Sequence, residues 1–160
     1  MKKLISLVLI ICALFLLTSC NSNPEWQKAE HTYSQLGFTV SYNYPNGCNA
    51  VSSDDDPDIC IYADGIEDKL DWSISMSVRN MNFSQFEDYK GEVSKTTSDI
   101  KQKDDIWTFV YEEPQERTVI LKWFECGKLL TLLPANDFNY NDAFEVAKTF
   151  EIDVWGEDIR

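Results

Sequence analysis

The stretch WSISMSVR, residues 72–79, alternates apolar and polar side chains with a period of two. The stretch FTVSYNY, residues 38–44, shows the same alternation. Successive side chains of a strand point to opposite faces, so each stretch predicts a β-strand with one buried face and one solvated face. Such strands are typical of antiparallel sheets, because parallel sheets are usually covered on both faces. The two stretches therefore predict a mostly antiparallel sheet.

Further strands are predicted on both sides of residues 72–79. Period-two patterns, with proline or glycine at the turns, predict strands at residues 59–62, 106–112, 118–125, 129–133 and 152–154. The strands at 106–112, 118–125 and 129–133 are expected to form a meander. In the first of them, alternation places Trp107, Phe109 and Tyr111 on one face, and in the second it places Val119, Leu121 and Trp123 on one face. Most of these rings are expected in the core. A set that faced water would instead form a groove for a sugar, a lipid or a protein.

Two segments have helical spacing. Asn82 and Gln85 have the spacing of a capping box, which predicts a helix that starts at residue 83. A second helix is predicted after Asn141-Asp142, with a core-facing stripe of Ala143, Val146, Ala147 and Phe150. Two helices packed on a mostly antiparallel sheet define the α+β fold class.

The N-terminus has the pattern of an export signal. Two lysines at positions 2 and 3 precede an apolar run at residues 4–17, interrupted only by Ser6. A membrane-spanning helix needs about 20 apolar residues, so this run fits the hydrophobic region of a signal peptide better.

The residues that follow this run resemble the lipobox of a bacterial lipoprotein signal, LTSC at residues 17–20. The resemblance implies removal of residues 1–19 and attachment of acyl chains such as palmitate to Cys20, which would make the membrane a partner through those chains. It also implies export to the bacterial cell envelope. In a Gram-negative cell, Asn21 after the anchor would favour sorting to the outer membrane. An ordinary secretory signal that ends at a cysteine is the alternative.

Three segments are expected along the chain: the signal at residues 1–19, a lipidated tether at 20–29 and one domain at 30–160. Without the signal, 141 residues hold 12 basic and 27 acidic side chains, a net charge of −15. This charge excludes general binding to nucleic acid, which needs basic residues to displace counterions. It also repels anionic lipids, so the acyl chains must hold the domain at the membrane.

Three cysteines remain after the signal and the anchor are set aside: Cys48, Cys60 and Cys126. If a hairpin loop lies near residue 54, Cys48 and Cys60 would face each other, and a disulfide is predicted between them. Closing so short a loop would contribute about 3 kcal/mol in the chain-entropy model. A bridge from either cysteine to Cys126 and three reduced thiols are the alternatives.

An acidic segment separates the first two of these cysteines. Asp54, Asp56 and Asp58 alternate, as oxygen ligands of a hard cation often do. The spacing departs from the helix-loop-helix calcium site, because Ile59 stands at the sixth position and Gly65 at the twelfth. A solvated hairpin tip is the leading interpretation and weak divalent binding the alternative. No cofactor is predicted.

The stretch GFTVSYNYP, residues 37–45, is similar to the opening of PsbP-like and DcrB-like lipoprotein domains. The resemblance covers about residues 30–152 and implies an α/β/α sandwich with a curved antiparallel sheet. It carries no catalytic signature. Members of these families differ in function, so the resemblance informs the fold more than the role.

The residue pattern names no catalytic group. His31 is the single histidine, expected to be exposed after the tether, and no nucleophile is placed beside it by spacing. The leading hypothesis is a non-enzymatic, lipid-anchored envelope module that binds a protein or a small ligand through its sheet face or an aromatic groove. A hydrolase that uses carboxylates between Asp54 and Asp71, and a structural spacer, are the alternatives.

Overall fold

The computed structural model describes residues 25–53, 56–63, 73–97, 100–111, 116–135 and 140–155. The strands are β1 (Trp26–Tyr33), β2 (Phe38–Pro45), β3 (Cys48–Ser52), β4 (Asp58–Ala63), β5 (Ser73–Asn80), β6 (Lys101–Lys103), β7 (Ile106–Tyr111), β8 (Arg117–Phe124), β9 (Lys128–Pro134) and β10 (Glu151–Val154). The described helices are α2 (Phe83–Thr96) and α3 (Tyr140–Thr149). Neither of these helices is long and apolar enough to cross a membrane.

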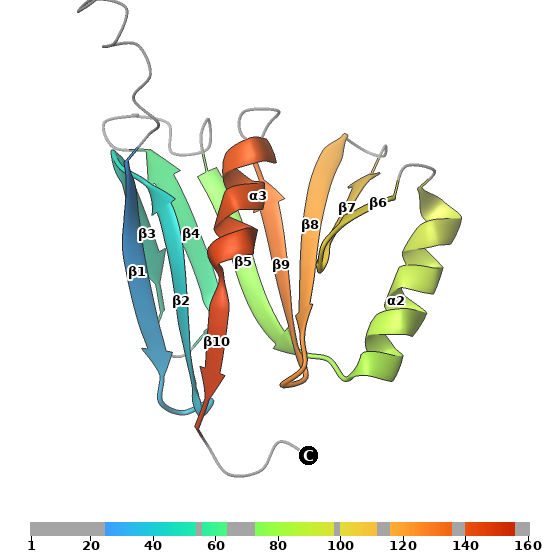
Figure 1. Ribbon diagram of the computed structural model, residues 1–160, viewed down its shortest axis with the longest axis horizontal. Helices are drawn as coiled ribbons and strands as arrows, with labels where there is room; N and C mark the ends of the chain where they lie inside the picture. Colours follow the sequence, from blue (N-terminus) through green and yellow to red (C-terminus); the bar gives the residue numbers. More distant parts are fainter. Residues whose placement is uncertain are drawn as a thin grey trace, which may run out of the picture.

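The strands form two antiparallel sheets (Figure 1). One has seven strands in the order β3-β4-β5-β9-β8-β7-β6, and the other has three in the order β1-β2-β10. Every strand pairing among the described residues is antiparallel. The predicted α+β class is therefore confirmed.

The alternating stretches behave as their patterns predict. In β5, the side chains of Ile74, Met76 and Val78 are buried, and Ser75 and Arg79 are exposed. The predicted meander corresponds to β7, β8 and β9, and the predicted last strand corresponds to β10. In β5 the period appears because one face of the strand is buried, whereas in β8 Val119, Ile120, Leu121 and Lys122 are all buried because both faces are covered.

The helix α2 begins with the predicted capping box. The Asn82 side chain accepts a hydrogen bond from the backbone N–H of Gln85 at 2.9 Å, and the Gln85 side chain accepts one from the backbone N–H of Asn82 at 2.9 Å. These bonds satisfy donors that the first turn leaves without helical partners. The buried side of α2 carries Phe86 and Val93.

The seven-stranded sheet has a core on each face. On one face, α3 and the three-stranded sheet cover β4, β5, β8 and β9, and the buried side chains include Tyr42, Ile61, Ile74, Leu132 and Val146. On the other face, α2 packs over β7, β8 and β9 through Phe86, Val93, Phe109, Val119, Leu121 and Leu129. Figure 1 shows α2 at the end of the sheet formed by β8, β7 and β6, away from β3 and β4. The two helices therefore lie on opposite faces, as in the expected sandwich.

A buried lysine joins α3 to the sheet. The Nζ of Lys122 in β8 donates to the carbonyl oxygens of Ala147 at 3.1 Å and Phe150 at 3.3 Å. The last carbonyls of a helix have no helical partners and carry partial negative charge, so a cation there stabilises the helix end. Lys122 is 8% exposed, so its hydrogen bonds to Ala147 and Phe150 take the place of water at these carbonyl oxygens.

Two features differ from the sequence-based expectations. The strand β1 begins at Trp26, inside the segment predicted to be tether, and pairs along its whole length with β2. Apolar residues are few in β1, so its period was not recognised. The sheet is also divided, because β2 pairs with β1 and β10 and not with a strand of the larger sheet. The signal and Cys20 lie outside the described residues.

Candidate functional site

Among the residues that the structure describes, the face of the seven-stranded sheet that carries α2 is covered on only one half. On the other half, in β3, β4, β5 and the end of β9, the outward side chains include Val51 (52% exposed) and Leu133 (39% exposed). Ser75 between them is also exposed. We call this region, formed by Val51, Asp58, Cys60, Ser75, Ser77 and Leu133, the open face.

A single row of paired residues shapes the open face. Val51 pairs with Cys60, Cys60 pairs with Ser75, and Ser75 pairs with Leu133, so four strands contribute one residue each. The two inner residues are small and the two outer residues are large. The row is therefore a trough, with Cys60 and Ser75 as the floor and two apolar side chains as walls.

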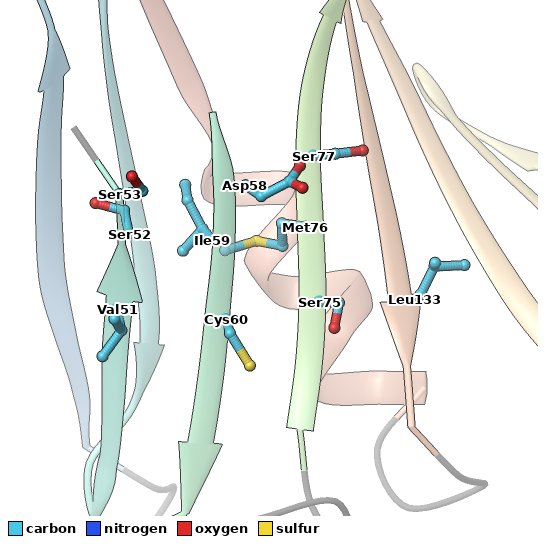
Figure 2. A pocket seen from close by; sticks show the side chains of 10 residues that line it. All are labelled: Val51, Ser52, Ser53, Asp58, Ile59, Cys60, Ser75, Met76, Ser77 and Leu133. Carbon is cyan, nitrogen blue, oxygen red and sulfur yellow. The ribbon is translucent and has the colours of Figure 1, made fainter. Parts of the chain in front are cut away.

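The neighbouring row on the same face is polar. Asp58 pairs with Ser77, and Ser77 pairs with Thr131. Figure 2 shows the Asp58 carboxylate reaching from β4 toward β5 beside Ser77. One end of the trough thus offers a carboxylate and hydroxyls, and the other offers apolar walls.

The trough holds a pocket with a volume of about 470 Å³ (Figure 2). This volume is within the range of small-molecule sites, roughly 300–1,000 Å³. Its lining consists of Val51, Ser52, Ser53, Asp58, Ile59, Cys60, Ser75, Met76, Ser77 and Leu133. None of these lining residues is basic.

The electrostatics of the pocket are set by Asp58. Burial raises the pKa of its carboxyl group, and the nearby Asp56 raises it further. Both effects disfavour a negative charge in this place. A positive charge brought to Asp58 would relieve them.

The predicted disulfide between Cys48 and Cys60 is absent from the structure. Cys48 pairs with Ala63, and Cys60 pairs with Val51, so the two cysteines are three residues out of register. An offset of three places them on opposite faces and about 10 Å apart along the strands, whereas bridged Cα atoms are usually about 4.4–6.8 Å apart. The prediction assumed a hairpin centred near residue 54, and the observed register rules out the pairing.

The third cysteine lies far from the open face in the fold. Cys126 is exposed in the turn between β8 and β9, and no disulfide joins the three described cysteines. Desolvation raises the pKa of the Cys126 thiol above its ordinary value, although Lys128 opposes the shift. A raised pKa reduces the thiolate fraction and hence the reactivity of a thiol.

Two of the three candidate metal ligands are described. Asp56 is exposed between β3 and β4, and Asp58 begins β4, whereas Asp54 lies outside the described residues. Within the ranges that the structure describes, no group of three histidine, cysteine, aspartate or glutamate side chains is placed to hold a metal ion.

His31 occupies a different environment from the one expected. It is half-buried: the Ser52 hydroxyl lies 2.8 Å from its Nδ1, and the Tyr42 hydroxyl lies 3.1 Å from its Nε2. Burial lowers the pKa of the imidazole. A serine beside a histidine is also the geometry of a nucleophile and its base. Here both ring nitrogens bond to hydroxyls between β1, β2 and β3, so His31 links the small sheet to the large one.

The side chains of Trp107, Phe109, Tyr111 and Trp123 in β7 and β8 lie in the core under α2, as the core interpretation predicts. Trp107 and Trp123 pack beside Phe86, and the Trp123 Nε1 donates to the Met81 carbonyl oxygen at 2.8 Å. The Lys90 amine lies 4.0 Å from the centre of the Trp107 ring. This cluster is therefore helix packing and not an aromatic groove.

Sequence reasoning missed the open face as a site, although it placed part of the face correctly. Ser75 and Ser77 were expected on the solvated side of their strand, and the structure confirms that side. The signal that was overlooked is that serine replaces the charged residues usual on a solvated strand face. Placing Val51 and Leu133 on the same trough requires the register of four paired strands, which a local sequence pattern does not contain.

No protein-family model matches the chain, and no curated protein matches its sequence. Among solved structures, the chain is similar to the solution structure of cyanobacterial PsbP (CyanoP) from Synechocystis sp. PCC 6803. The identity is 12% and the TM-score is 0.46, over 84% of this chain and 97% of that chain.

Proposed function

We propose that this chain is a lipid-anchored module of the bacterial cell envelope that binds a ligand or partner on its open face and has no catalytic role. The observation that carries the proposal is the trough between Val51 and Leu133, on a sheet face that α2 covers over its other half. Large exposed apolar side chains around a concave site are typical of binding surfaces.

The composition of the open face supports binding. Two of the large exposed apolar side chains of the described chain, Val51 and Leu133, stand on the same trough. The floor residues Cys60 and Ser75 are small and allow a ligand to approach the sheet closely. The face therefore combines apolar area with hydroxyl groups that can orient a bound molecule.

The fold would hold the polar end of the trough away from the anchor. Glu25, inside the predicted tether, is the first described residue, and its carbonyl oxygen accepts a hydrogen bond from the Asn46 backbone N–H at 2.9 Å. From this end, β3 runs toward Ser52, so Asp58 lies about 16 Å away along a five-residue strand. An anchor at Cys20 would thus present Asp58 to the aqueous side.

The hydrolase alternative rests on carboxylates between Asp54 and Asp71. Of these, Asp56 and Asp58 are described, and they lie on the same hairpin end. No observation favours this alternative over binding, so it is not proposed.

Site-specific photo-crosslinking in intact envelopes tests the proposal. A benzoylphenylalanine placed at Val51 is expected to form adducts, and the same group at Glu92, on the exposed side of α2, is expected to form none. The variant Ser75→Tyr, which fills the trough, should abolish the adducts at position 51. The matched variant Ser84→Tyr, on α2, should leave them unchanged.

Equal adducts at positions 51 and 92, or adducts at position 51 that survive Ser75→Tyr, would contradict the proposal. Circular dichroism of each variant checks that the fold is retained.

A further inference from the structure

We propose that the trough binds a small amphipathic organic cation, with its ammonium group at Asp58 and its apolar body between Val51 and Leu133. This inference rests on the proposed function, because it names the class of ligand that the open face accepts. It follows from the shape of the pocket, the distribution of charge around it and the placement of nearby basic residues.

The pocket has the size and polarity of a site for an amphipathic molecule. Its volume is about 470 Å³, which suits a small ring or a short chain and is too small for a packed helix. The apolar row and the polar row are neighbours on the same face, two residues apart along each strand. That separation is about 7 Å, so a molecule that touches both rows needs an apolar body at one end and an amine at the other.

Charge selects a cation over an anion. Asp58 is the single charged side chain among the described residues of the lining, and Asp56 adds a second negative charge nearby. Hydroxyl groups from Ser75 and Ser77, on the same face of β5 as Asp58 is of β4, supplement the carboxylate. A charge-assisted hydrogen bond to a carboxylate is about twice as strong as a neutral one.

The basic residue of β5, the strand that pairs with β4 beside Asp58, is directed elsewhere. The Arg79 guanidinium carbon lies 5.2 Å from the centre of the Tyr89 ring on α2. Arg79 is therefore held by the helix that covers the other half of the face, and Asp58 remains available to a ligand. The net charge of −15 after signal removal would also attract a cation.

Alkylation of Cys60 in the purified full chain tests the inference, because its thiol lies on the trough floor. The probes are cyclohexylmethylammonium, cyclohexylmethanol and cyclohexanecarboxylate, which share one carbon skeleton and differ in charge. Iodoacetamide modification of Cys60 is followed by mass spectrometry of its peptide. Cys126, exposed in a distant turn, is the internal control.

The cation is expected to slow modification of Cys60 at a concentration about tenfold lower than the alcohol needs, and the carboxylate to be weaker still. The variant Asp58→Asn should raise the concentration of cation required to that of the alcohol. The matched variant Asp153→Asn, on β10 of the other sheet, should not change it. Cys126 should react equally in all cases.

Equal protection by the three probes, or unchanged protection in Asp58→Asn, would overturn the choice of a cation while the open face still binds. No protection by any probe would overturn the small-ligand inference. In either case the crosslinking at Val51 decides separately whether the open face binds a partner, and adducts with a protein or with a second copy of this chain would identify that partner instead.

Discussion

Val51 and Leu133 stand on opposite sides of one trough because Cys60 and Ser75 connect them in a single row of strand pairs. The two wall residues come from distant parts of the sequence, and their relation exists only in the folded sheet. A shift of one residue in any of the three strand pairings would turn a wall or floor side chain to the other face. The shape of the open face therefore depends on this register.

Replacing Lys122 by methionine is expected to reduce the free energy of unfolding by about 2 kcal/mol, because the buried carbonyl groups of Ala147 and Phe150 lose their donor. Methionine retains most of the apolar stem. Chemical denaturation followed by circular dichroism measures the change.

The control for this prediction is Lys148→Met on α3. Lys148 is exposed and pairs with Glu145 at 2.8 Å, so its loss should cost less than about 0.5 kcal/mol. Equal losses for the two variants would show that Lys122 does not stabilise the end of α3.

Stability is expected to fall as the pH drops below about 6.5, the ordinary pKa of histidine. Burial lowers the pKa of His31 in the folded chain, so the unfolded chain takes up a proton first and its stability relative to the fold increases. The groups that face the ring, Tyr42 and Ser52, do not titrate in this range, since the pKa of Tyr42 is raised well above its usual value.

Unfolding measured between pH 5 and 8 checks this dependence, with His31→Gln as the control. The variant should lack the portion of the slope that lies between the folded pKa and about 6.5. The single histidine also gives one NMR titration curve. A folded pKa at or above 6.5 would refute the prediction.

Thr131→Val is expected to be neutral or to stabilise the fold by up to about 1 kcal/mol, because it removes a buried hydroxyl without changing the shape of the side chain. Within the described part of the chain, the Thr131 Oγ1 is buried and makes no hydrogen bond. Thr39→Val is the contrasting variant, since the Thr39 hydroxyl accepts a bond from the Trp155 Nε1 at 3.2 Å. A thermal melt in which Thr131→Val unfolds at a clearly lower temperature would count against this explanation.

Cys20→Ser is expected to move the chain out of the membrane fraction and to abolish labelling by an alkyne analogue of palmitate, because acyl chains supply the membrane affinity. Cys12→Ser, inside the signal, should change neither result. Continued labelling of Cys20→Ser would contradict the prediction, because the lipid would then be attached to another residue.

Local patterns were sufficient for much of the fold. The capping box at Asn82 and the alternation in β5 record hydrogen bonds and burial that act within a few residues, so the sequence displays them directly. The strand β1 was not predicted, because the residues that alternate along its inner face include only two apolar ones, Ala29 and Tyr33. His31 on the same face is polar and interrupts the pattern.

The arrangement of the site was less accessible to sequence reasoning. The hairpin between β3 and β4 pairs Cys60 with Val51 and not with Cys48, and a turn of unknown length does not specify that register. For the same reason, the sequence does not predict that the residues from Val51 to Leu133 pair in one row. Asp58 was identified as a candidate ligand, but its neighbours on β5 and β9 come from tertiary pairing.

The accessibility of Cys60 in intact envelopes tests the central claim, binding on the open face, most directly. Its rate of alkylation, divided by that of Cys126, is compared between envelopes and the purified full chain. Occupation of the trough predicts a ratio about threefold or more lower in envelopes, and Ser75→Tyr should remove the difference between the two preparations. Equal ratios in envelopes and in the purified chain would contradict the claim.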